Sequence, residues 1–218
     1  MKNKMINSWD TLPIGVFQKL YEIEQEKDED SEYRILAALN GMTLEQVLDL
    51  PVSKVNDMAQ EAAFLFEKPK KRKVQKSYVI NGRKYEVTLN YKEMTTAQYI
   101  DFKNFAPECN KHLASFLTVF FVPEGHKYNS GYNVEFVAKE LSESLSVEDA
   151  LSLSAFFFKK CKRWIRRTLL FSEAALLTLK WKMPKKMKEE KEQMEMAIEL
   201  LRQMERSIST FGLDLWRR

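Results

Sequence analysis

The sequence is poor in the residues that build most metal and catalytic sites, with only two cysteines and two histidines among 218 residues. Two cysteines give no disulfide framework and suit a reducing compartment. Cys109 and His112 are spaced like zinc ligands on a helix, and Cys161 and His126 could complete a set of four. A structural zinc site normally supplies two paired clusters, however, and the second pair is missing here. We therefore predict no metal site.

Glycine and proline are also scarce, at six residues each. So few scattered glycines cannot build a phosphate-binding loop. Neither histidine lies in a recognisable nucleophile motif, and paired carboxylates occur only in charged runs typical of a solvated surface. We expect a protein that is not an enzyme and that uses no cofactor.

No apolar run is long enough to cross a membrane, because the most apolar windows, 113–122 and 169–179, fall short of roughly 20 residues. The first four residues are not followed by an apolar segment, so no signal peptide is expected. The apolar fraction of 44% and the charged fraction of 30% are those of a folded soluble protein. These features predict a cytoplasmic protein without membrane contact.

The clearest local pattern that is present is a β-hairpin at about residues 78–91. Asn81-Gly82 supplies the two positive-φ residues of a tight hairpin turn, and aromatic and β-branched residues flank it. The rest of the chain shows helical periodicity. The predicted fold class is therefore mainly α, a helical bundle with one small hairpin and a C-terminal amphipathic helix.

Several helix starts are marked by capping residues. Thr43 and Thr95 each begin a capping-box pattern, and Asn133 and Ser53 can also cap helices. The helix after Ser53 is expected to turn Phe66 toward the core. An apolar helix is expected over about 111–122, and the longest helix over about 146–181.

The buried face of that longest helix is predicted from its periodicity. It comprises Ala150, Leu153, Phe157, Cys161, Trp164 and Thr168.

Changes in composition divide the chain into four parts. We predict an N-terminal helical subdomain (1–67), a basic linker (68–77), the hairpin with a helical core (78–182), and a C-terminal amphipathic helix (183–218). Pro184 separates the last two parts.

Two basic clusters are candidates for binding polyanions. The first, in the linker, is similar to a short nuclear localisation signal, but a solvated linker can have the same composition. The second lies on the longest helix, opposite its predicted core face, where a solvated face is the alternative. The candidate residues are Lys70, Lys71, Arg72, Lys73, Lys159, Lys162, Arg163 and Arg166.

Two other segments are candidates for binding a protein partner. The C-terminal helix carries apolar side chains at heptad spacing, and its flexible methionines can repack around varied apolar partners. Folding back onto the core is the alternative. The turn-rich loop 123–132 is rich in tyrosine, as binding loops often are. The candidate partner-binding residues are Met187, Met194, Leu201, Met204, Ile208, Tyr128 and Tyr132.

A resemblance to a known family rests on four segments and their order. They are Tyr78-Val79-Ile80-Asn81-Gly82-Arg83-Lys84-Tyr85, Met94-Thr95-Thr96-Ala97-Gln98-Tyr99-Ile100-Asp101, Phe121-Val122-Pro123-Glu124-Gly125 and Ala150-Leu151-Ser152-Leu153-Ser154-Ala155-Phe156-Phe157. With the helices before them, over about residues 9–181, they resemble tailed-bacteriophage morphogenesis proteins, especially the tail assembly chaperones.

This resemblance implies a non-enzymatic protein in the cytoplasm of an infected bacterium. It would bind apolar helices of the tape-measure protein, help tail-tube subunits assemble, and could form homo-oligomers. Two alternatives remain open. One is a structural component of the virion, such as a neck, connector or internal protein. The other is a nucleic-acid-binding regulator that uses the basic clusters.

Overall fold

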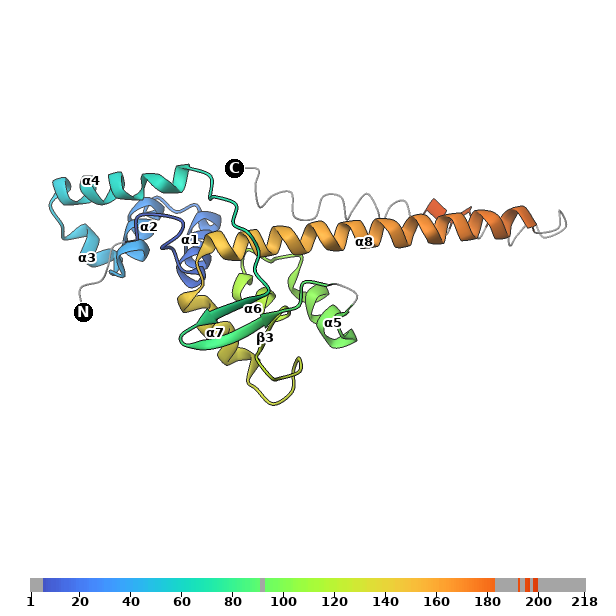
Figure 1. Ribbon diagram of the computed structural model, residues 1–218. Coiled ribbons are helices and arrows are strands. Elements are labelled where there is room, and N and C mark those ends of the chain that lie inside the picture. Colours follow the sequence, from blue (N-terminus) through green and yellow to red (C-terminus); the bar gives the residue numbers. More distant parts are fainter. Residues whose placement is uncertain (1–5, 91–92, 183–191, 193–194, 197, 200–218) are drawn as a thin grey trace. The chain divides into compact units, whose positions relative to one another are not determined.

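The computed structural model describes residues 6–90, 93–182, 192, 195–196 and 198–199, and it confirms a mainly helical fold with a small antiparallel sheet. The chain forms two compact units, residues 1–154 and 155–218. Figure 1 shows the elements in order: α1 (Ile14–Glu26), α2 (Ser31–Asn40), α3 (Leu44–Leu48), α4 (Val52–Glu61), the 3-10 helix η1 (Ala62–Phe66), β1 (Ser77–Ile80), β2 (Arg83–Val87), α5 (Thr96–Phe105), α6 (Leu113–Thr118), β3 (Phe121–Pro123), α7 (Val134–Ser144) and α8 (Val147–Lys182).

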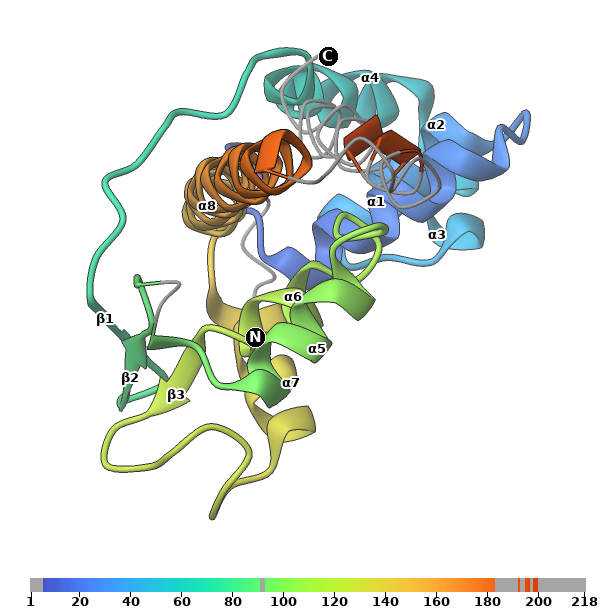
Figure 2. The same ribbon diagram turned by 90° about the vertical axis from the view of Figure 1, so that its right-hand side faces the viewer.

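The predicted hairpin is confirmed and is part of a larger sheet. β1 and β2 pair antiparallel around Asn81 and Gly82, whose φ angles are 50° and 78°. β3 adds to the other edge of β2, so the strand order is β1-β2-β3 (Figure 2). The prediction of one helix over 111–122 is therefore wrong at its end. The chain leaves the helix after Thr118, and the buried aromatic and β-branched run that follows is suited to a strand.

Most predicted helix starts are confirmed. Thr43 and Thr95 each make both hydrogen bonds of a capping box. The Asn133 side chain accepts hydrogen bonds from two backbone N–H groups in the first turn of α7. The cap predicted at Ser53 is wrong, because α4 begins directly after Pro51 and no side chain caps it.

The core of the first unit is rich in phenylalanine. Phe102, Phe116 and Phe120 contact one another with ring centroids 5.4–6.0 Å apart. Tyr78 and Tyr85 point from one face of the sheet onto Phe121, with centroids 5.4 and 6.4 Å apart. These contacts cover a face of the hairpin, which would be only marginally stable alone.

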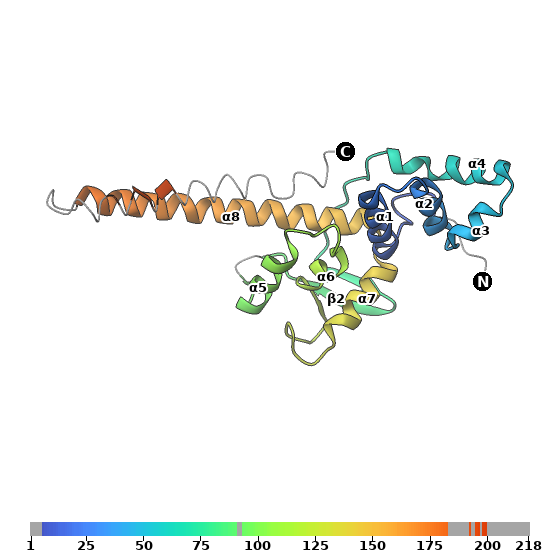
Figure 3. The same ribbon diagram turned by 180° about the vertical axis from the view of Figure 1, so that it is seen from behind.

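The N-terminal segment is joined to the α7–α8 junction. The Ile14 N–H donates to the Leu145 carbonyl (3.2 Å), and the Val147 N–H donates to the Leu12 carbonyl (2.9 Å). Helices α1 and α7 lie side by side (Figure 3). They approach closely at Gly15, where a Cβ would collide with the Ser142 side chain. The N-terminal helices and the sheet with its helices thus belong to one compact unit, residues 1–154.

The predicted buried face of α8 is confirmed where its side chains are described. Ala150, Leu153 and Phe157 are buried. The other members of that face, Cys161, Trp164 and Thr168, lie outside the residues whose side chains are described. The expectation that Phe66 faces the core is wrong, because its side chain is 94% exposed and Met58 is the buried residue of α4.

Candidate partner-binding surfaces

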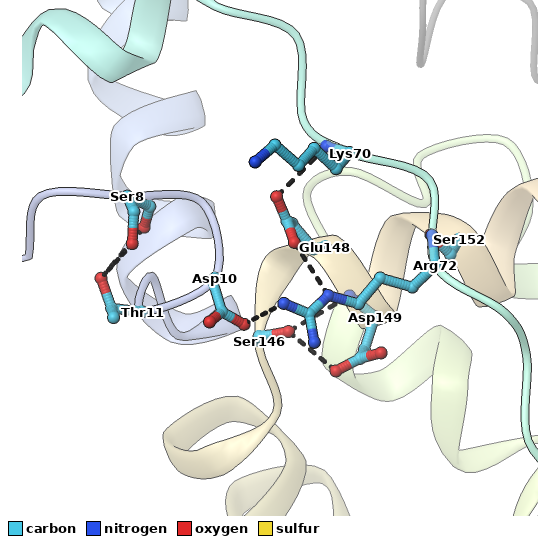
Figure 4. A network of polar contacts seen from close by, with 9 residues as sticks. All are labelled: Ser8, Asp10, Thr11, Lys70, Arg72, Ser146, Glu148, Asp149 and Ser152. Carbon is cyan, nitrogen blue, oxygen red and sulfur yellow. Dashed lines mark hydrogen bonds and ion pairs between the residues drawn. The ribbon is translucent and has the colours of Figure 1, made fainter.

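The basic linker is held against the first turns of α8 by a buried carboxylate. Glu148 is 5% exposed, and its two oxygens accept hydrogen bonds from the Lys70 backbone N–H (3.2 Å) and from Arg72 Nε (2.8 Å). The Arg72 guanidinium also pairs with Asp10, and its backbone N–H donates to Ser152 Oγ (2.9 Å). Figure 4 shows Arg72 between the two carboxylates.

This network changes the interpretation of the first basic cluster. The hydrogen bond with Glu148 raises the pKa of Arg72 above its ordinary value, so the guanidinium is a stable partner for the carboxylate. Arg72 therefore has a structural role within the first unit. Lys70, Lys71 and Lys73 have exposed side chains. No sequence pattern links residue 72 to residue 148, so this contact could not be predicted.

The two candidate tyrosines of the loop are engaged within the chain. The Tyr128 hydroxyl donates to Asp101 Oδ2 (2.6 Å), and burial together with this hydrogen bond raises the pKa of Tyr128. The Tyr132 hydroxyl accepts a hydrogen bond from the Asn129 N–H (3.3 Å), and its ring packs edge-on against His126 (5.9 Å). Both side chains are half-buried, so they anchor the loop to the fold.

A second buried polar contact lies between the sheet and α7. The Tyr85 hydroxyl donates to Glu140, and burial raises the pKa of Tyr85 with this hydrogen bond as a further cause. Arg83 Nε is 3.9 Å from Glu140 Oε1, and its guanidinium lies 4.7 Å from the centre of the Phe136 ring. Each polar group in this cluster has a partner, so the cluster fixes α7 on the sheet.

The later part of α8 presents apolar side chains to solvent. Leu177 is 46% exposed and Trp181 is 92% exposed. Because they are four residues apart, they lie one above the other on the same side of the helix. The sequence already contained this signal, since helical rotation places both residues opposite the predicted core face. Neither residue is among the sequence-predicted sites, because the predictions for this helix rest on its core face and on its basic residues.

The second basic cluster lies on the same helix. The side chains of Lys159 and Arg163 are exposed, whereas Lys162 and Arg166 are not among the residues whose side chains are described. Lys160 Nζ lies 5.4 Å from the centre of the Phe156 ring. Of this cluster, the two residues with described side chains, Lys159 and Arg163, both face solvent.

The C-terminal candidates lie outside the described residues. They are Met187, Met194, Leu201, Met204 and Ile208. Among the described residues of this segment, Met196 is 65% exposed and Ile198 is buried.

The candidate metal ligands Cys109, His112 and His126 have other surroundings in the structure. Within the described ranges, no group of three histidine, cysteine or acidic side chains could hold a metal ion. Cys109 is buried, which raises the pKa of its thiol to about 12. His112 lies 3.8 Å from Glu108, and His126 contacts the Glu124 carbonyl. No helix in the described part of the chain is long and apolar enough to span a bilayer.

Comparison with known proteins gives no relative: no family model, no curated protein and no solved structure matches the chain.

Proposed function

We propose that this protein is a non-enzymatic phage assembly protein, similar to a tail assembly chaperone, that binds apolar helices of a partner. The partner would be the tape-measure or tail-tube protein in the cytoplasm of the infected bacterium. One observation carries the proposal: Leu177 and Trp181 are exposed one turn apart on α8.

An exposed pair of this kind is suited to helix–helix recognition. Large apolar side chains at positions i and i+4 are the anchors by which amphipathic helices bind one another. Tryptophan is also the side chain that most often dominates a protein interface. Burying a tryptophan removes roughly 200 Å² from water, or about 5 kcal/mol before the costs of association.

The basic clusters support a protein partner better than a nucleic acid. A nucleic-acid surface uses several lysines and arginines that can each reach a phosphate. In the linker, the Arg72 side chain is held by Glu148 and Asp10 instead. On α8, the exposed Lys159 and Arg163 share the helix with an apolar pair that phosphates cannot satisfy.

Co-expression with the tape-measure protein tests this function. We expect the full chain to keep that protein soluble, and the double variant Leu177→Ser/Trp181→Ser to lower its soluble yield at least five-fold. Phe66→Ser is the matched control, because it removes an equally exposed aromatic ring from η1. Equal yields with the wild type and the double variant would exclude α8 as the binding helix.

Two further measurements separate the alternatives. Deleting residues 183–218 tests the C-terminal candidates, and we expect it to lower partner capture while the first unit stays folded. Mass spectrometry of purified particles tests the virion alternative. A chaperone is absent from particles, whereas a neck, connector or internal protein is present at fixed stoichiometry.

A further inference from the structure

Four of the exposed side chains in the later part of α8 form one stripe. Lys159 and Leu177 are eighteen residues apart, which is five full turns of an α-helix, so they point in the same direction. Arg163 and Trp181 each follow four residues later and lie about 40° further round the helix. We call these four residues the α8 stripe.

The α8 stripe is divided by chemistry along its length. Its first half carries two positive charges, and its second half carries two large apolar side chains. At about 1.5 Å of rise per residue, the charged and apolar halves are separated by about 20 Å. The buried side chains of Phe157 and Phe158 lie on the other side of the helix.

The two charges in the stripe face solvent. Both cationic side chains are exposed, and among the described residues no carboxylate lies within ion-pair distance of Lys159 or Arg163. This differs from Arg72, whose guanidinium is already held by two carboxylates. An exposed charge on a helix surface favours a partner of opposite charge and speeds its association.

We propose that the α8 stripe docks an amphipathic helix that carries carboxylates at one end and apolar side chains at the other. This inference rests on the helix-binding function proposed above. It adds the chemistry of the partner and states which part of the partner lies against which half of the stripe. The carboxylates lie against Lys159 and Arg163, and the apolar side chains lie against Leu177 and Trp181. A nucleic acid fits this surface less well, because its phosphates continue along the strand where the stripe becomes apolar.

Two designed helical peptides of about 18 residues test the proposal with the full-length protein. Both carry leucines along one half of a single face, and the other half of that face carries glutamate in one peptide and lysine in the other. Binding is measured by fluorescence anisotropy at low salt. We expect the glutamate peptide to bind at least ten-fold more tightly than the lysine peptide, with a preference that shrinks as salt is added.

Variants then assign this preference to the stripe. We expect Lys159→Glu/Arg163→Glu to abolish the preference for the glutamate peptide. We expect Trp181→Ser to weaken the binding of both peptides by a similar factor. The matched control is Lys19→Glu/Lys103→Glu, which changes the net charge equally at exposed positions on α1 and α5 and should keep the preference. Helicity measured by circular dichroism shows that each variant is folded.

The remaining outcomes overturn the proposal in distinguishable ways. Equal binding of both peptides to the wild type would contradict the pairing of partner carboxylates with Lys159 and Arg163, but it would be consistent with the helix-binding function. Failure of both peptides to bind would overturn the helix-binding function as well. An oligonucleotide that competes with the glutamate peptide through Lys159 and Arg163, but not Trp181, would favour a nucleic acid instead. Self-association abolished by Leu177→Ser/Trp181→Ser would assign the stripe to a second copy of the chain.

Discussion

Helix α8 has opposite surface chemistry in its first turns and in its later part. In the first turns, the carboxylate of Glu148 and the hydroxyl of Ser154 are buried, and each has a hydrogen-bond partner. In the later part, the apolar side chains of Leu177 and Trp181 are exposed. One end of the helix therefore buries polar groups, and the other end exposes apolar ones.

This difference separates stability from binding. A buried polar group is tolerated because partners inside the fold replace the water that it loses. An exposed apolar group gains nothing from the fold, and large exposed apolar side chains that gather on one surface often mark an interaction site. The first turns of α8 therefore hold the first unit together, whereas the later part is where a partner is expected.

The largest expected effect on stability comes from a comparison of two leucines on this helix. Leu153 is fully buried, so Leu153→Ala should lower the free energy of unfolding by about 3 kcal/mol through lost burial and a residual cavity. Leu177 is half-exposed, so Leu177→Ala should cost about 0.5 kcal/mol or less. Urea denaturation followed by circular dichroism measures both. Equal losses would mean that Leu177 is buried in solution and would contradict its place in the stripe.

Removing the buried carboxylate should have the next largest effect. Glu148→Ala leaves Arg72 without its more buried partner and leaves the Lys70 N–H unsatisfied. Breaking a buried ion pair costs about 3–5 kcal/mol, but the Arg72 side chain is 40% exposed, so solvent screening reduces the expected loss to about 2 kcal/mol. The same denaturation assay applies. Lys73→Ala, an exposed residue of the same linker, is the control and should change stability by less than about 0.5 kcal/mol.

A smaller effect with a defined pH dependence is expected at Tyr85. Tyr85→Phe leaves the buried Glu140 without its hydroxyl donor and should cost about 1.5 kcal/mol at neutral pH. Because the folded-state pKa of Tyr85 is raised, its neutral form contributes stability below the unfolded pKa of about 10, and this contribution is lost as the pH rises above it. Unfolding measured from neutral to alkaline pH should therefore show a shallower decline in the variant. An identical decline in both proteins would contradict the buried hydrogen bond.

The sequence predicted local structure well and long-range polar contacts poorly. The turn at Asn81-Gly82 and the capping boxes at Thr43 and Thr95 depend on residues close in sequence, and each was found. The sequence predicts helix at Phe121, where the structure has a strand, because a short buried apolar run has no distinctive period.

The contacts of the candidate sites also differ in whether residues close in sequence encode them. The bond between Arg72 and Glu148 joins residues 76 positions apart, and no local pattern encodes it. The exposure of Leu177 and Trp181, in contrast, could have been predicted, because helical rotation alone separates them from the core face.

The smallest expected effect belongs to the charges of the stripe. Lys159→Glu/Arg163→Glu should change the free energy of unfolding by less than about 0.5 kcal/mol, because exposed charges contribute little to the stability of the fold. The same reversal should alter binding of an acidic helix strongly, so stability and binding are expected to separate at these two positions. A loss of stability comparable to that of Glu148→Ala would show that Lys159 and Arg163 are held by carboxylates of this chain. Both parts of α8 would then have charged side chains paired within the chain, and the charged half of the stripe would not be available to bind an acidic helix.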